Sequence, residues 1–124
     1  MLNAKACFAA LCILTATTSR SHSTPLTGND IRADCQASLS TYQEPRGASP
    51  ASGYKLGFCS GFVIAVLDLG SLLDDTISFC RPSEVTAEQA TRVLLKYMDA
   101  HPEETHERAE PLAVAAFRTA WPCN

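Results

Sequence analysis

Cysteine is the residue type in this 124-residue chain with the most distinctive chemistry, and there are six of them. Cys59 lies in a G-x-C-x-G run, residues 57–61, which matches the cysteine form of a nucleophile elbow. An elbow needs a preceding strand, which the Gly/Pro-containing loop at 43–52 does not supply, and a cysteine in a disulfide is no nucleophile. No C-x-x-C spacing indicates a zinc site. We therefore expect no enzyme activity, no cofactor and no metal; a secreted cysteine hydrolase is kept as an alternative.

A second candidate site combines two histidines and three glutamates: His101, His106, Glu103, Glu104 and Glu107. They suit a metal or acid-base cluster, a solvated hairpin tip, or an acidic surface that recognises a partner. Between residues 99 and 110 there are five acidic residues and one arginine, a net charge of −4. Such a patch would steer association with a basic partner surface.

The amino-terminal segment has the pattern of a signal peptide. Lys5 precedes an apolar run from residue 6 to 14, which is too short to span a bilayer, and small and hydroxyl residues follow. The alternative is an amphipathic first helix. We expect cleavage between Thr18 and Ser23, export to the periplasm, and a single mature domain of residues 24–124 with no membrane attachment.

Removal of residues 1–23 changes the charge and the cysteine count. The net charge moves from −3 to −5, because Lys5 and Arg20 are lost. An acidic chain argues against electrostatic binding of nucleic acid. Four cysteines remain, which in an oxidising compartment predicts two disulfides with three possible connectivities: Cys35, Cys59, Cys80 and Cys123.

The elements that must position these residues are all helical, because no stretch alternates apolar and polar residues for the length of a strand. We predict helices over about 29–42 with Asn29 as the cap, 53–73, 86–100 and 102–120. Thr86 and Gln89 have the spacing of a capping box. The expected fold is a small all-α domain of four helices, arranged as two helical hairpins and stapled by two disulfides.

The predicted helix over 53–73 is the most apolar, so we expect it to be central and buried on more than one side. Gly53, Gly57 and Gly61 recur every four residues, which predicts a bare face for close packing of another helix. A membrane helix would share this pattern, but Lys55 and Asp68 argue against one.

The fourth predicted helix contains two prolines. His101-Pro102 turns the chain and should start the helix, with Glu103 and Glu104 in its first turn. Pro111 should then kink or restart it.

Geometry favours one disulfide connectivity. If the last two helices form an antiparallel hairpin, Cys123 lies near the start of the third helix, close to Cys80. Cys35 and Cys59 would then join the first two helices. Pairing Cys59 with Cys80 instead would make the chain retrace about 20 Å of helix over a short turn.

An ordered set of short motifs resembles a known family. The motifs are the G-x-C-x-G run, Phe79-Cys80-Arg81-Pro82, Tyr97-Met98-x-x-His101-Pro102-Glu103 and Trp121-Pro122-Cys123. With these motifs, the chain from about residue 31 to 123 resembles the Rap/Tai-type immunity proteins, which are small exported helical proteins that protect Gram-negative bacteria from type VI secretion amidase effectors.

The resemblance implies a homodimer that binds a papain-like peptidoglycan amidase and blocks its active-site groove. It places the plug in the loop between the last two helices: His101, Pro102, Glu103 and Glu104, flanked by Asp99 and His106. Exposed positions of the partner subunit's third helix would add contacts: Glu88, Arg92 and Lys96. Pro111 is a departure from what the resemblance leads us to expect in the last helix. The alternative function is a periplasmic acid-stress chaperone of the small disulfide-stapled kind, which exposes apolar surface when a dimer dissociates at low pH.

Overall fold

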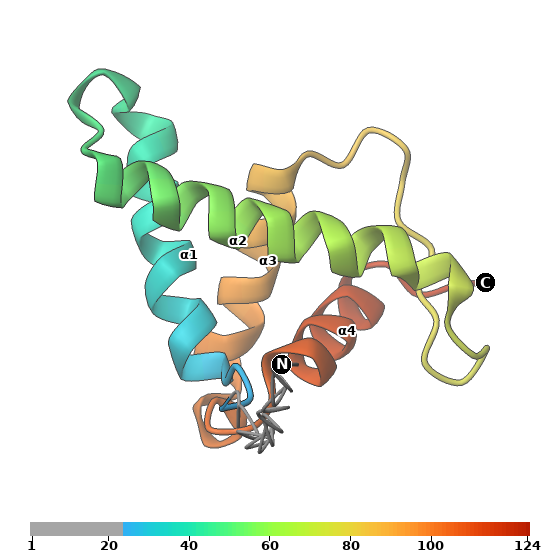
Figure 1. Cartoon of the computed structure of the whole chain (residues 1–124). Coiled ribbons are helices and arrows are strands. Elements are labelled where there is room, and N and C mark those ends of the chain that lie inside the picture. Colours follow the sequence, from blue (N-terminus) through green and yellow to red (C-terminus); the bar gives the residue numbers. More distant parts are fainter. Residues whose placement is uncertain (1–23) are drawn as a thin grey trace, which may run out of the picture.

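The computed structural model describes residues 24–124, so the predicted signal peptide lies outside the described residues. Four α-helices follow one another: α1 (Gly28–Gln43), α2 (Pro50–Leu69), α3 (Ala87–Ala100) and α4 (Ala109–Ala120) (Figure 1). Short 3₁₀ turns lie between them: η1 (Pro45–Gly47), η2 (Gly70–Leu72) and η3 (Pro102–Glu104). The described part of the chain forms no strand beyond an isolated bridge between Thr27 and Arg108. The all-α prediction is confirmed.

Side-chain caps set where α1 and α3 begin. The Thr27 side chain accepts the N–H of Asp30, and the Asp30 carboxylate accepts the N–H of Thr27, so Thr27 rather than Asn29 is the cap of α1. The predicted cap at Asn29 is wrong because Asp30, like glutamate, can complete a capping box. Thr86 caps α3 and accepts the N–H of Gln89 at 3.1 Å, which is one half of the predicted capping box; the Gln89 side chain does not return a bond to Thr86.

The start of α4 differs from the prediction. Helix α4 begins at Ala109, so the residues from Pro102 onward form the separate turn η3 and a short loop instead of a first helical turn. Pro111 is the third residue of α4, where a backbone N–H has no partner within the helix. Its missing N–H therefore costs nothing there, and of the two predicted effects the structure shows the restart, not the kink.

The two disulfides have the predicted connectivity. Cys35–Cys59 joins α1 to α2, and Cys80–Cys123 joins the segment before α3 to the end of the chain after α4, with S–S distances of 2.01 and 2.04 Å. The second link is reinforced by the Cys80 N–H, which donates to the Trp121 carbonyl at 2.8 Å. Each disulfide therefore ties one helical hairpin together.

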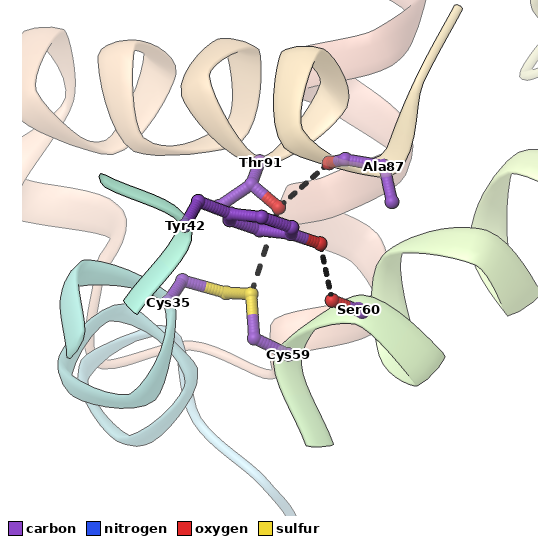
Figure 2. The surroundings of a disulfide bond; sticks show 6 residues. All are labelled: Cys35, Tyr42, Cys59, Ser60, Ala87 and Thr91. Carbon is purple, nitrogen blue, oxygen red and sulfur yellow. Dashed lines mark hydrogen bonds between the residues drawn. A yellow bond between two sulfur atoms is a disulfide. The ribbon is translucent and has the colours of Figure 1, made fainter. Parts of the chain in front are cut away.

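Three helices meet around the Cys35–Cys59 bond, which is fully buried (Figure 2). Thr91 of α3 lies 3.7 Å from the Cys59 sulfur and donates its hydroxyl hydrogen bond to the Ala87 carbonyl. Tyr42 of α1 hydrogen-bonds Ser60 of α2 at 2.8 Å. Cys59 is thus a buried half-cystine in the middle of a helix, and the G-x-C-x-G run is not a nucleophile elbow.

Helix α2 crosses α1 and α3 and buries only one face (Figure 1). The buried residues are Cys59, Val63, Val66 and Leu67. The prediction of burial on more than one side is wrong. No helix of the subunit packs on the glycine face, because a Cβ at any of the three glycines would meet nothing within 4 Å. An interface with another chain is the remaining reason for that face. By length and composition Pro50–Leu72 would suffice to cross a membrane, although the core helix of a soluble domain meets the same criterion.

Candidate functional site

The segment that joins α3 to α4, residues 101–108, is held rigidly; we call it the tip loop. The His101 N–H donates to the Tyr97 carbonyl at 3.0 Å and ends α3. The η3 turn follows, and Thr105 is buried with its hydroxyl donating to the Pro102 carbonyl at 2.9 Å. The loop is thus a compact turn stabilised by its own hydrogen bonds.

The amino terminus of α1 anchors the tip loop. The first N–H groups of a helix have no partner within it, and here carbonyls of the loop accept them. The Gly28 N–H donates to the Glu107 carbonyl and the Asn29 N–H donates to the Thr105 carbonyl, both at 2.8 Å. The Ala109 N–H donates to the Leu26 carbonyl at 2.9 Å. Backbone bonds on both sides therefore fix the loop to the start of the domain.

Gly28 makes this anchorage possible. A Cβ at this position would lie 2.5 Å from the Leu112 side chain and 2.7 Å from the Thr105 carbonyl oxygen. Both separations are below van der Waals contact, so only glycine allows α1 and the tip loop to approach this closely.

Three predicted plug residues are brought together at the surface. The Nδ1 atom of His101 lies 3.6 Å from Oε1 of Glu103 and 3.9 Å from Oε1 of Glu104. All three side chains are between 38% and 69% exposed. Their ligand atoms lie within 4.8 Å of one another, so they could hold a divalent cation, and without one they form an ion-pair cluster when His101 is protonated.

Tyr97 packs beneath this cluster, although the sequence placed it only in the motif of residues 97–103. Its hydroxyl donates to Oε2 of Glu104 at 3.2 Å, and its ring centroid lies 4.3 Å from that of His101. Partial burial, with the neighbouring Glu104 and Glu103 carboxylates, raises the pKa of Tyr97 above its ordinary value. Its position four residues before His101 on one helix is the signal that could have revealed this contact.

The other predicted plug residues lie around the cluster. Asp99 forms an ion pair with Arg32 of α1, which sequence reasoning also missed. Pro102 and His106 are exposed on the tip loop. Arg108 is engaged by Glu110, with 3.3 Å between Nη2 and Oε1. Arg108, the single arginine between residues 99 and 110, is therefore paired with Glu110 of α4. The other carboxylates leave the tip loop with a net negative charge.

The predicted second contact set lies along one exposed stripe of α3. Glu88 and Arg92 form an ion pair one turn apart, at 2.7 Å, and Lys96 follows at the next turn. Lys96 also lines a shallow groove of about 320 Å³ between α3 and α4, together with Tyr97 and His101. The stripe and the tip loop are thus continuous along α3, and Lys96 lies between the Glu88–Arg92 ion pair and the acidic tip.

A protein-family model matches most of the chain. The family model described as Rap1a immunity proteins matches residues 27–123. No curated protein and no solved structure is significantly similar to the chain. The match begins at the residue that caps α1 and ends at the last cysteine, so it includes all four helices and both disulfides.

Proposed function

Because this chain belongs to the Rap1a immunity protein family, we propose that it protects a bacterium by binding a type VI secretion peptidoglycan amidase and blocking its active-site groove. The family match supports the immunity role. The observation that supports a blocking mechanism is the rigid, acidic and exposed tip loop. The protein would act by binding alone, with no catalytic activity and no cofactor.

The geometry of the tip loop suits an inhibitor. A loop that is already ordered loses little conformational entropy on binding. Two backbone hydrogen bonds from α1, three within the loop and the bond of the Thr105 hydroxyl order this one. Glu103 and Glu104 project carboxylates from it. In a papain-like enzyme the catalytic histidine is protonated when paired with a thiolate, so it would attract such a carboxylate by a charge-assisted hydrogen bond.

We also propose that the protein acts in the periplasm and as a homodimer. Disulfides persist in oxidising compartments, and peptidoglycan lies in the periplasm, so residues 1–23 would be a cleaved signal peptide that exports the domain there. The protein would act as a homodimer, in which Glu88, Arg92 and Lys96 of one copy add contacts to the amidase held by the tip loop of the other.

Charge reversal at the tip tests the proposal. Glu103→Lys and Glu104→Lys should each weaken binding to the cognate papain-like amidase by about 30-fold or more, because each would put a positive charge against the catalytic imidazolium. Glu84→Lys is the matched control, since Glu84 is also an exposed glutamate but lies before α3, at its opposite end from the tip loop. Titration calorimetry with the purified amidase measures all three. Equal affinities for the tip and control variants would contradict the plug.

One observation favours the alternative, an acid-stress chaperone: α2 exposes large apolar side chains, among them Tyr54 at 68% and Leu69 at 52%. A chaperone would bind unfolding clients through this face after a dimer dissociates at low pH. Dimer mass and suppression of client aggregation, measured from neutral to acidic pH, separate the two functions. A dimer that stays intact at low pH would exclude the chaperone.

A further inference from the structure

The face of α2 opposite the core is a continuous apolar surface. Three of its large side chains are exposed, Tyr54 at 68%, Ile64 at 44% and Leu69 at 52%, and Leu72 of the following η2 turn is 78% exposed. Gly53, Gly57 and Gly61 lie among them, all exposed. Exposed apolar surface of this extent along one helix marks an interaction site.

Folding of the subunit does not explain this face. A Cβ at any of the three glycines would meet nothing within 4 Å, and none of them has a positive φ. Interior glycines lower helix stability relative to alanine. Gly70, by contrast, is required within the subunit, because its Cβ would lie 2.4 Å from the Phe79 ring.

We infer that a second copy of this chain covers this face, with α2 packed antiparallel against α2 about a twofold axis at Gly61. The inference rests on the homodimer of the proposed function and assigns its surface. An interface about a twofold axis uses the same patch on both copies, so the patch must be complementary to itself. In an antiparallel pair, residues equidistant from the axis face each other.

The apolar residues of α2 make the face complementary to itself about such an axis. Four residues from Gly61 on either side lie Gly57 and Ala65, both small and exposed, so the two backbones can approach closely. Three residues away lie Phe58 and Ile64, both large and apolar. Small residues would therefore face small ones at the axis, with large apolar side chains packing beside them.

The polar residues on this face are also complementary to one another across the proposed axis. Seven residues from Gly61 lie Tyr54 on one side and Asp68 on the other, a hydrogen-bond donor opposite an acceptor. One oxygen of Asp68 accepts a bond from Arg81 at 3.0 Å, and an ionised carboxylate has further acceptor sites. Lys55, next to Tyr54, would place a positive charge near Asp68 of the second copy. The charges are thus complementary across the axis.

A lipid bilayer fits this face less well. Covering it with hydrocarbon would bury Asp68, which lies on the same side of the helix as Gly61, and glycines offer lipid little apolar area. A second copy of α2 would offer Asp68 a polar partner and would pack closely on the glycines. The amidase is another candidate occupant of this face, and the affinity of Gly61→Gln for the amidase distinguishes it from a second copy.

Cysteine cross-linking tests the axis directly. Gly61→Cys should form an intermolecular disulfide, because the axis brings residue 61 of the two copies together, whereas Gly57→Cys should not, because it faces Ala65. Both variants add one thiol at an exposed site, so each controls for disulfide exchange in the other. Non-reducing electrophoresis and intact mass report the product. Cross-linking of both indicates a parallel pair, and cross-linking of neither indicates a different surface; either result overturns the inference.

A polar substitution tests whether the face holds the dimer. Gly61→Gln should weaken the dimer by at least about 30-fold, because the added side chain occurs twice at the closest contact. Thermal unfolding of the separated subunit should be unchanged or improved, since glutamine favours helix more than glycine does. Ala33→Gln, on an exposed position of α1, is the control. Sedimentation velocity over a concentration series measures the dimer affinity of both variants.

The outcomes separate this inference from the function it rests on. A wild-type protein that is monomeric at every concentration contradicts the homodimer itself, while a dimer that survives Gly61→Gln contradicts only the surface. Loss of amidase affinity in Gly61→Gln with an unchanged oligomeric state would show that the amidase covers α2. Binding of the wild type, but not Gly61→Gln, to phosphatidylglycerol vesicles would show that lipid does. Both results would overturn the inference.

Discussion

Tyr97 shows how a single residue can connect the core to the binding surface. Its ring packs under His101, and its hydroxyl donates to Glu104, so the core holds the orientation of two side chains on the tip loop. The sequence places Tyr97 in a short motif with His101 and Pro102. The contact with Glu104 was missed because a motif does not reveal where the hydroxyl of a half-buried tyrosine points.

Tyr97→Phe should weaken amidase binding by about 5- to 10-fold while lowering stability by no more than about 1 kcal/mol, since it removes one hydrogen bond and keeps the ring. Tyr42→Phe is the matched control, because it loses the bond to Ser60 inside the α1–α2 hairpin. Calorimetric binding and thermal unfolding measure both. Equal binding losses in the two variants would show that Tyr97 acts only through stability.

The raised pKa of Tyr97 adds a pH dependence to this prediction. A raised pKa in the folded state favours the protonated phenol, so the stabilisation is full below pH 10 and is lost as the pH rises through the raised pKa. The wild type should therefore lose stability above pH 10 more steeply than Tyr97→Phe.

At the scale of elements, the start of α1 acts as a clamp on the tip loop. Its first N–H groups are satisfied by loop carbonyls, and Gly28 allows the contact. Sequence patterns located α1 but not the clamp, because capping follows from local spacing whereas the partners of Gly28 and Asn29 lie about 80 residues later. For the same reason the sequence predicted the start of α3 at Thr86 correctly and the start of α4 incorrectly.

Gly28→Ala tests the clamp. The added Cβ would overlap the Leu112 side chain and the Thr105 carbonyl, so we expect a loss of about 1–3 kcal/mol in the free energy of unfolding and weaker amidase binding. Gly47→Ala is the control, because a Cβ there meets nothing within 4 Å and its effect should be near zero. Chemical denaturation measures the stability. If Gly28→Ala unfolds like Gly47→Ala, the clamp is not rigid.

At the scale of the molecule, the four helices present two surfaces, an acidic tip and an apolar helix face. The connectivity of the disulfides was predictable, because a helical hairpin brings its two ends together. The exposure of α2 was not predictable: its composition resembles that of a central helix, and only the arrangement of α1, α3 and α4 shows that they cover one side. An apolar sequence indicates that a face will be buried, without indicating whether the subunit or a partner buries it.

The most direct test of the central claim is whether the protein shields the catalytic thiol of its amidase. The amidase is mixed with increasing amounts of the wild-type protein, and the rate at which iodoacetamide alkylates the thiol is followed by mass spectrometry. We predict that alkylation falls in proportion to the free amidase and returns with the Glu103→Lys, Glu104→Lys double variant. A tight complex in which the thiol still reacts at the rate of the free enzyme would contradict the plug.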